Sequence, residues 1–312
     1  MRILVTGAAG FIGSNLVEAL VAQGDDVIGV DNFIAGRREN VAQFAGRIEF
    51  VEGDVRDLDT CRRVCAGADY VLHEAAIGSV PRSVADPITS NDHNVNGTLC
   101  MLVAARDAGV KRFVYAASSS AYGDTEVLPK VEAMRPAPLS PYAVSKYVGE
   151  LYCQVFAQLY GLPAIGLRYF NVFGRRQDPE GPYAAVIPKF ARAILRGERP
   201  TLYGDGEQTR DFNYIDNVVQ ANLAACAAPA AAIGEVFNIG GGQRITVNAL
   251  AGKMIALLGS DVEPEHVPPL PGDVRHSLAD IGKARRLLGY DPKIDVLGGL
   301  ERAIGWYREN LG

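Results

Sequence analysis

The sequence predicts an α/β fold in which a doubly wound parallel sheet is followed by a smaller α/β region. Two observations predict it: short apolar runs rich in valine and isoleucine alternate with longer stretches of helical periodicity, and glycines directly follow the first run. Runs that are apolar throughout suit strands buried on both faces, and their alternation with helices implies right-handed crossovers. We expect strands at residues 3–6, 27–30, 48–51, 70–73, 113–117 and 164–168, and helices at 12–23, 57–66, 91–108 and 142–160.

After about residue 170 the pattern changes, because loops rich in proline, glycine and charge become longer and the apolar runs shorter. We expect a first domain over residues 1–170 and a second region over 171–312. Residues 235–239 read as one more strand of the main sheet. The boundary is therefore not clean, and the chain is expected to return to the first domain at about 212–242.

Composition favours a small-molecule partner in a reducing compartment. With 31 basic and 36 acidic residues the net charge is −5 and no basic run stands out, which argues against a nucleic-acid surface. The five cysteines form an odd set without metal-ligand spacing, as in reduced cytosolic proteins. No apolar run reaches the roughly 18 residues of a membrane span, and the N-terminal run is too short for a signal peptide. We expect a cytoplasmic protein.

The first turn carries glycines at Gly7, Gly10 and Gly13, between a strand and an amphipathic helix. A dinucleotide diphosphate must approach the backbone amides at such a helix N-terminus, where side chains would block it. Asp31 closes the second strand, 18 residues beyond Gly13, where a carboxylate accepts both ribose hydroxyls and repels a 2′-phosphate. The pattern predicts NAD rather than NADP. A tight strand-to-helix turn beside a solvated Asp31 is the structural alternative.

Two later strand ends agree with this cofactor. The sequence Gly53-Asp54-Val55 follows the third strand, where an adenine edge would lie, and the small Ala75-Ala76 pair follows the fourth. Either pair is also compatible with packing alone. The residues expected to bind the cofactor within residues 1–170 are Gly7, Gly10, Phe11, Ile12, Gly13, Asp31, Asn32, Asp54, Val55, Ala75, Ala76, Tyr142 and Lys146.

A serine strand end and a Tyr-Lys pair predict the catalytic chemistry. The fifth strand ends at Ser118-Ser119-Ser120, and Tyr142 opens a helix with Lys146 one turn later. A phenol has a pKa of about 10, so lowering it by about three units requires roughly 4 kcal/mol of preference for the phenolate. Lys146, on the same helix face, supplies much of this preference, helped by the positive nicotinamide ring and the helix N-terminus. A surface tyrosine stacked on a lysine stem is the alternative reading of an isolated pair.

Together these motifs resemble the extended short-chain dehydrogenase/reductases that act on nucleotide sugars. The resemblance spans essentially the whole chain, through HEAA, ASSSAYGD, LSPYAVSKYVGELY, GLRYFNVFG and GDVRHSLAD, and is closest to the UDP-hexose 4-epimerases, especially their UDP-N-acetylglucosamine 4-epimerase branch. It implies a Rossmann-type NAD-binding domain and a UDP-sugar-binding region. By this resemblance Tyr142 is the catalytic base, Lys146 orients the nicotinamide ribose, and Ser118 binds the sugar 4-hydroxyl, with Ser119 or Ser120 sharing that role.

The residues after Ser118 discriminate between reactions. Related dehydratases carry Asp-Glu at these two positions, and UDP-glucuronate decarboxylases carry a glutamate at the second. Ser119 and Ser120 cannot perform carboxylate acid-base work, so elimination and decarboxylation are disfavoured. The expected reaction is 4-epimerisation through a transient 4-keto sugar.

The resemblance also implies the nucleotide and sugar contacts. Asn171, Ala185 to Ile187 and Arg210 are expected to hold the uridine diphosphate, whereas for Arg275 the role stays open. Arg175 and Arg176 are expected in a solvated loop rather than at the nucleotide. This branch usually has an arginine where the chain has Leu270, so another arginine replaces that clamp or nucleotide affinity is weaker. The substrate-binding residues expected are Ser118, Tyr142, Asn171, Ala185, Val186, Arg210, Arg275 and Ser277.

Ser277 stands where enzymes limited to UDP-glucose and UDP-galactose carry a tyrosine, and a serine leaves room for an N-acetyl group. The expected substrates are therefore UDP-N-acetylglucosamine and UDP-N-acetylgalactosamine, with some activity on the unacetylated pair. The alternatives are a UDP-glucose or a UDP-glucuronate 4-epimerase and, from another class, a non-catalytic NAD-binding sensor.

The remaining expectations concern the histidines and assembly. His73 reads as a hydrogen-bonding residue at a strand end, and His93, His266 and His276 lack metal-ligand spacing, so no metal is predicted. In the family, helices corresponding to 91–108 and 142–160 pair in a homodimer, which we also expect here.

Overall fold

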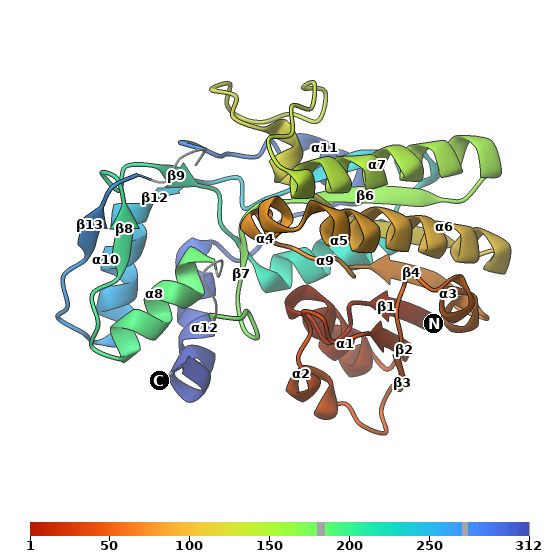
Figure 1. The fold of residues 1–312 in the computed structure, drawn as a ribbon, viewed down its shortest axis with the longest axis horizontal. Coiled ribbons are helices and arrows are strands. Elements are labelled where there is room, and N and C mark those ends of the chain that lie inside the picture. Colours follow the sequence, from red (N-terminus) through yellow and green to blue (C-terminus); the bar gives the residue numbers. More distant parts are fainter. Residues whose placement is uncertain (180–184, 270–273, 312) are drawn as a thin grey trace.

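The computed structural model describes residues 1–179, 185–269 and 274–311, and its centre is a seven-stranded sheet (Figure 1). The strand order is β11-β6-β5-β4-β1-β2-β3, and every pair is parallel. The doubly wound α/β fold is therefore confirmed. The strands are β1 (Arg2–Thr6), β2 (Asp26–Asp31), β3 (Glu49–Glu52), β4 (Tyr70–His73), β5 (Arg112–Ser118), β6 (Ala164–Tyr169) and β11 (Val236–Ile239).

Helices cover both faces of this sheet. On one face α3, α6 and α7 pack together over an apolar cluster, and on the other α1 packs against α9. Two further short helices, α4 and α5, lie against α7. The bounds are α1 (Phe11–Gln23), α2 (Arg38–Ala42), α3 (Leu58–Cys65), α4 (Val80–Ala85), α5 (Pro87–Asn91), α6 (Gly97–Ala108), α7 (Pro141–Tyr160) and α9 (Ile215–Cys226).

The helix expected over 91–108 is not continuous. It comprises the end of α5, a π-helical turn at Asp92–Asn96, and α6. Asn94 explains the turn, since its buried amide accepts from Ile77 N at 2.8 Å and donates to Ser145 Oγ at 3.0 Å. The widened turn thus brings a polar side chain inward and joins it to α7.

The smaller lobe lies at one end of the sheet, at the left of Figure 1. Three two-stranded sheets form it, pairing β10 with β7, β12 with β9, and β13 with β8. Its strands are β7 (Val172–Phe173), β8 (Thr201–Tyr203), β9 (Thr209–Arg210), β10 (Asn213–Tyr214), β12 (Ile245–Thr246) and β13 (Glu265–Val267). Its helices are α8 (Val186–Leu195), α10 (Val247–Leu258) and α12 (Val296–Leu311), and α11 (Gly282–Leu288) packs against β11. In the described part of the chain, no helix has the length and apolar character needed to cross a bilayer.

Buried polar contacts fix α7 against the sheet. Arg168 of β6 donates to both carboxylate oxygens of Glu150 at 2.8 and 2.7 Å, and both side chains are almost fully buried. Tyr115 Oη donates to Lys146 O at 3.1 Å, and a Cβ at Gly149 would lie 2.2 Å from that hydroxyl oxygen. These contacts fix the position of α7 against β5 and β6.

His73 has the hydrogen-bonding role predicted for it at a strand end. Its Nδ1 lies 2.8 Å from Thr6 Oγ1 and its Nε2 lies 3.0 Å from Thr98 Oγ1, so it joins β4 to β1 and α6. Burial lowers the pKa of His73 to about 3, which keeps the ring neutral. Within the described residues, no group of three or more His, Cys, Asp or Glu side chains is arranged to hold a metal ion.

Candidate active site

A cavity of about 760 Å³ runs along the carboxyl ends of the strands, where ligands bind in open parallel sheets. Most of the residues singled out from the sequence line it together. These are Gly7, Gly10, Phe11, Ile12, Gly13, Asp31, Asn32, Val55, Ala75, Ala76, Ser118, Ser119, Ser120, Tyr142, Lys146, Asn171, Arg210 and Ser277.

The glycine turn is shaped by close backbone contacts. Gly7 has a φ of +66°, and a Cβ at Gly13 would lie 2.1 Å from the Gly7 carbonyl oxygen. Gly10, the N-cap of α1, offers no side chain to the first amides of the helix. Those amides are left for a ligand, and the positive end of the helix dipole favours an anionic one.

Asp31 lies at the end of β2, beside this turn. Its Oδ2 accepts from Ala9 N at 2.9 Å and its Oδ1 from Phe33 N at 2.7 Å. Burial raises the pKa of this carboxyl group, and the three neighbouring backbone N–H groups oppose that shift. A Cβ at Gly36 would lie 2.8 Å from both carboxylate oxygens, so a glycine there leaves them uncovered.

Asp54 differs from the other expected cofactor residues because it does not line the cavity, whereas Gly53 and Val55 do. Its carboxylate accepts from Asn32 Nδ2 at 2.9 Å and pairs with Arg56 at 2.7 Å. The Arg56 guanidinium holds the pKa of Asp54 well below its ordinary value. The connection of Asp54 to the cavity is therefore indirect, through its hydrogen bond with Asn32, which lines the cavity.

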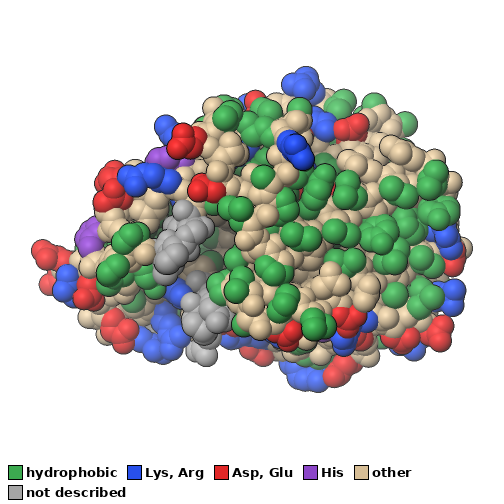
Figure 2. All heavy atoms as spheres, turned by 45° about the horizontal axis from the view of Figure 1, so that its top comes forward, with side chains coloured by type: hydrophobic (Ala, Val, Ile, Leu, Met, Phe, Trp, Pro, Cys, Tyr) green, Lys and Arg blue, Asp and Glu red, His purple; other side chains and the backbone are tan. Residues whose placement is uncertain are grey.

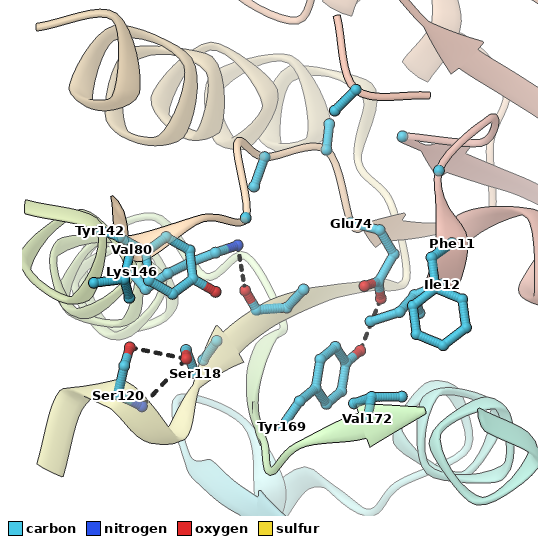
Figure 3. A pocket seen from close by; sticks show the side chains of 18 of the residues that line it. Phe11, Ile12, Glu74, Val80, Ser118, Ser120, Tyr142, Lys146, Tyr169 and Val172 are labelled. Carbon is cyan, nitrogen blue, oxygen red and sulfur yellow. Dashed lines mark hydrogen bonds between the residues drawn. The ribbon is translucent and has the colours of Figure 1, made fainter. Parts of the chain in front are cut away.

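The expected catalytic side chains meet at the end of β5 (Figure 3). Ser118 Oγ accepts from the backbone N and the Oγ of Ser120, at 3.2 and 2.9 Å. Ser140 caps α7 by accepting from Ala143 N at 3.1 Å, with Pro141 in the first turn, as its sequence predicts. This start presents Tyr142 to the cavity, with Lys146 one turn deeper.

Burial is the largest influence on the pKa of both members of this pair. Burial raises the pKa of Tyr142, a hydrogen bond with Ser118 opposes that shift, and ionised Glu74 adds to it. Burial also lowers the pKa of Lys146 to about 8, against the charges of Glu74 and Glu150. The ammonium donates to Ala116 O at 2.8 Å. Among these influences on Tyr142, the hydrogen bond with Ser118 is the one that favours the phenolate.

The smaller lobe supplies the opposite wall. Asn171 Nδ2 donates to Asp211 O at 3.0 Å and to Ser277 Oγ at 3.1 Å, and Arg210 Nη1 donates to the carbonyl oxygens of Thr209 and Arg275. These contacts fix Asn171 and Ser277 side by side.

Three expected substrate contacts are not part of the cavity wall: Ala185, Val186 and Arg275. Ala185 and Val186 lie at the start of α8. The exposed guanidinium of Arg275 donates to Asp205 Oδ2 at 2.9 Å, because a carboxylate on the surface is its nearer partner. Leu270 lies outside the described residues.

Residues 3–240 match the NAD dependent epimerase/dehydratase family. The chain belongs to this family. It is 40% identical over 310 residues, covering 99% of both chains, to a putative UDP-glucose 4-epimerase of Methanocaldococcus jannaschii. It resembles the solved UDP-glucose 4-epimerase of Thermotoga maritima with UDP-glucose (41% identity, TM-score 0.94, all of both chains). It also resembles the UDP-N-acetylglucosamine 4-epimerase of Methanobrevibacter ruminantium in complex with UDP-N-acetylmuramic acid (38% identity, TM-score 0.93, 98% and 97% of the chains).

As a member of this NAD-dependent family, the protein uses NAD, and its cavity fits that cofactor. The glycine turn leaves a cradle at the N-terminus of α1 that a Cβ would fill, and Asp31 offers carboxylate oxygens at the end of β2. A diphosphate and a ribose diol are the groups that these two features suit.

Several residues that line this cavity were not singled out from the sequence, among them Glu74 and Tyr169. Both directly follow or end a strand, β4 and β6, so the rule that ligands bind at carboxyl ends could have found them. Others depend on loop paths that no local pattern indicates, and these are Ile34, Ala35, Val80, Leu139, Val172 and Gln177.

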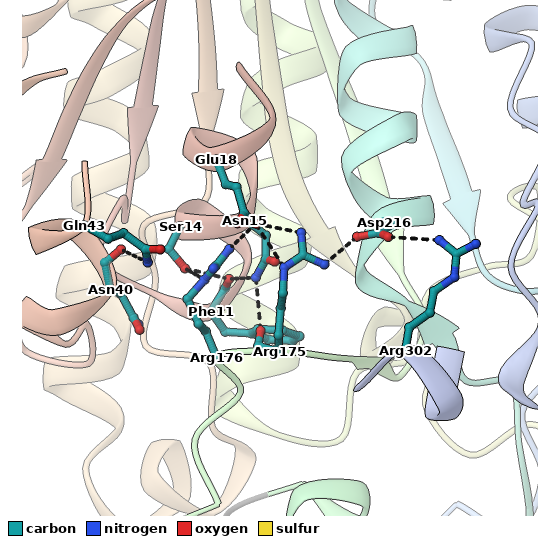
Figure 4. Close-up of polar contacts among 10 residues, drawn as sticks. All are labelled: Phe11, Ser14, Asn15, Glu18, Asn40, Gln43, Arg175, Arg176, Asp216 and Arg302. Carbon is teal, nitrogen blue, oxygen red and sulfur yellow. Dashed lines mark hydrogen bonds and ion pairs between the residues drawn. The ribbon is translucent and has the colours of Figure 1, made fainter. Parts of the chain in front are cut away.

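Arg175 and Arg176 were expected in a solvated loop, and this was wrong. Figure 4 shows both guanidinium groups directed at Glu18 of α1, with hydrogen bonds of 2.7 and 2.8 Å. Arg176 is buried with a φ of +67° and also donates to Ser14 Oγ at 3.0 Å. Arg175 also binds Asp216 of α9. The two arginines thus join the loop after β7 to the helix that follows the glycine turn.

We expect Glu18→Ala to destabilise the protein, because it removes the shared carboxylate and leaves Arg176 buried with only Ser14. The cost is about 2 kcal/mol, less than for a fully buried pair, since the Glu18 side chain is 38% exposed. The matched control is Arg302→Ala, whose exposed guanidinium lies 3.6 Å from Asp216, with an expected change under about 0.5 kcal/mol. Equal denaturant midpoints for the two variants would contradict this account.

Proposed function

We propose that the protein is an NAD-dependent 4-epimerase of UDP-hexoses that interconverts UDP-N-acetylglucosamine and UDP-N-acetylgalactosamine and also acts on UDP-glucose and UDP-galactose. One observation carries the proposal: Ser118, Tyr142 and Lys146 share a cavity with the glycine turn, and serines occupy the next two positions after Ser118. The relatives named as 4-epimerases, similar along the whole chain, support it.

In this proposal the chain supplies one base and its support. Tyr142 accepts the proton of the sugar 4-hydroxyl, which Ser118 holds by a hydrogen bond, with Ser119 or Ser120 assisting. Lys146 provides positive charge that favours the phenolate, and it orients the cofactor ribose. NAD, held at the glycine turn and by Asp31, would supply the acceptor for the hydride of carbon 4 and the source for its return to the opposite face of the sugar. Tyr142 then gives back its proton, so the cycle needs no other acid or base.

The cavity is poorly suited to the elimination and decarboxylation chemistry found elsewhere among nucleotide-sugar enzymes. Of the described residues that line it, Asp31 and Glu74 are the acidic ones. Asp31 is bound by Ala9 N at the glycine turn, and Glu74 is bound by Tyr169. Neither is at the position after Ser118 where an acid would reach a leaving hydroxyl. This supports epimerisation.

A sugar that must turn over cannot be held tightly at its ring, so binding energy has to come from the remote nucleotide. We assign residues 1–170, with about 212–242, to NAD and residues 171–312 mainly to the UDP-sugar. Asn171 and Arg210 support this because they line the cavity from the second region. Ala185, Val186 and Arg275 are kept in this assignment as proposed nucleotide contacts.

Ser277 is proposed to set the sugar specificity, because its small side chain lies beside Asn171 in the cavity wall. We expect Ser277→Tyr to lower kcat/KM for UDP-N-acetylglucosamine by about 10²-fold and for UDP-glucose by less than about tenfold, since the phenol fills the space of the acetamido group. The control is Ser277→Ala, which keeps that space and should retain both activities to a similar degree. Equal losses on both sugars in the tyrosine variant would refute the assignment.

Turnover of three substrates by the purified protein tests the proposed function. UDP-N-acetylglucosamine, UDP-glucose and UDP-glucuronate are compared at equal concentration, and the acetylated sugar is expected to have the highest kcat/KM. A preference for UDP-glucose or UDP-glucuronate would assign the same reaction to another sugar. No epimerisation of any of them, with NAD bound, would leave only a cofactor-binding role.

We also propose that the protein acts as a homodimer paired through α6 and α7. Figure 2 shows hydrophobic side chains gathered over the half of the molecule that carries these helices. On α7 the exposed apolar residues recur at helical spacing, at Val144, Leu151, Val155 and Leu159. Such a stripe is typical of a helix that packs against a partner.

A further inference from the structure

The first turn of α7, which carries Tyr142, needs hydrogen-bond acceptors from outside the helix, because the first N–H groups of a helix have no partner within it. Pro141 has no N–H group. Ser140 satisfies two of the next positions, since its Oγ accepts from Ala143 N at 3.1 Å and its carbonyl oxygen accepts from Val144 N at 2.9 Å. The N–H group of Tyr142 is the donor of this turn that Ser140 does not satisfy.

Ser83 of α4 supplies the acceptor for that group. Its Oγ accepts from Tyr142 N at 3.0 Å, although the two residues are 59 positions apart in the sequence. The same hydroxyl donates its proton to Val80 O at 2.6 Å. Ser83 is fully buried, and α4 packs against α7. A distant serine thus completes the N-terminal cap of the helix that carries the proposed base.

The same hydroxyl connects Tyr142 to the wall of the cavity. Val80, the first residue of α4, lines the cavity, and Figure 3 shows it beside Tyr142. Ser83 does not line the cavity. It binds Val80 through its proton and Tyr142 through its oxygen, so it acts on the cavity through these two residues and not by touching a ligand.

The position of the Tyr142 backbone decides where its hydroxyl lies. The carbonyl end of this residue is fixed within α7, because Ser145 Oγ donates to Tyr142 O at 2.8 Å. The N–H end is fixed by Ser83. A base that is displaced by about 1 Å can lose about 10²-fold in rate, so an anchor at this end of the residue matters for catalysis.

We infer that Ser83 is a positioning residue of the proposed epimerase: it accepts from Tyr142 N and thereby holds the phenol beside Ser118. The inference rests on the proposed function for its catalytic meaning. The hydrogen bond that it invokes is measurable without turnover.

Ser83→Ala tests the inference in the activity assay, because it removes the acceptor and leaves Tyr142 N without a partner. We expect kcat per bound NAD, for the UDP-sugar that the parent protein turns over best, to fall by about tenfold. KM and the NAD content per chain should stay within about twofold, since the proposed nucleotide and cofactor contacts are unchanged. Counting bound NAD corrects for any loss of folded protein, which a merely structural role would cause.

Ser90→Ala is the matched control. Ser90 lies on the other short helix, α5, which also packs against α7, and it is 1% exposed. Within the described part of the chain its Oγ has no hydrogen-bond partner, so alanine removes the same atom without removing a bond. Both kcat and KM of this variant should stay within about twofold of the parent values.

Amide hydrogen exchange follows the hydrogen bond itself. In protein labelled with ¹⁵N-tyrosine, the Tyr142 signal is identified by its absence in Tyr142→Phe. Its amide should exchange about tenfold faster in Ser83→Ala than in the parent protein or in Ser90→Ala. The amide of Tyr152, in the middle of α7, should keep its rate in all three proteins.

A parent-like kcat in Ser83→Ala, or an equal loss in Ser90→Ala, would overturn the inference. Unchanged exchange at Tyr142, or an equal rise at Tyr152, would do the same. A parent protein without turnover would count against the proposed function, and the exchange rates would still decide whether Ser83 holds Tyr142. Should Ser83→Ala fail to fold, Ser83→Cys carries the same expectation, because a thiol sulfur is a weak acceptor.

Discussion

Replacing Tyr142 with phenylalanine is expected to lower kcat for the sugar interconversion by about 10³-fold, in the range attributed to a positioned acid-base group. The hydroxyl is the group proposed to take the 4-hydroxyl proton. The ring remains, so the packing of α7 should be retained. Initial rates with UDP-N-acetylglucosamine measure the loss of kcat. The NAD content of the purified variant shows whether the site keeps its structure.

The matched control is Tyr147→Phe, one residue beyond Lys146 on the same helix and outside the cavity lining. It should stay within about twofold of the parent activity, because the half-buried Tyr147 does not line this cavity. A Tyr142→Phe variant as active as this control would remove the base assignment. Loss of NAD from that variant would instead attribute the effect to cofactor binding.

The second large effect is expected at the glycine turn. In Gly13→Ala the new Cβ would lie 2.1 Å from the Gly7 carbonyl oxygen and 2.7 Å from its carbon, and these backbone atoms cannot move without displacing β1 or α1. We expect a loss of about 3 kcal/mol in the free energy of unfolding. The N-terminus of α1 also shifts, so NAD affinity should fall by about 100-fold or more. Chemical denaturation and NAD binding by calorimetry measure the two effects.

Gly252→Ala is the control for this substitution. Gly252 lies in α10, where a Cβ would meet no atom within 4 Å, so alanine should stabilise the helix by up to about 1 kcal/mol. Unchanged stability and NAD affinity in Gly13→Ala would show that the turn tolerates a side chain. The account of the cradle would then be wrong.

The parts of the fold that sequence could predict are those with local causes. Buried strands appear in the sequence as apolar runs, and the glycine turn appears as regularly spaced glycines. Ser140-Pro141 marks the start of α7. The sheet, its strand ends and the helix that carries Tyr142 were therefore all expected. Ser118, Tyr142 and Lys146 were expected together for the same reason, since carboxyl ends of parallel strands meet at one edge.

The parts that could not be predicted depend on contacts between distant residues. Glu18 is far in sequence from Arg175 and Arg176, and nothing local indicates that one carboxylate binds both. The π-helical turn at Asp92–Asn96 forms because Asn94 finds partners at Ile77 and Ser145. Arg275 pairs with Asp205, and Asp54 pairs with Arg56, so neither Arg275 nor Asp54 lines the cavity. In each case a nearby opposite charge decides where the side chain points, and the position in the sequence does not.

The central claim is that hydride leaves and returns to the same carbon of a UDP-sugar inside this cavity. Incubation of the purified protein with UDP-N-acetylglucosamine carrying deuterium at carbon 4 tests it most directly, with NMR and mass spectrometry of the product. The account predicts UDP-N-acetylgalactosamine that retains the deuterium at carbon 4, without incorporation of solvent hydrogen at carbons 4 or 5. Deuterium lost to solvent, or hydrogen exchanged at carbon 5, would contradict it.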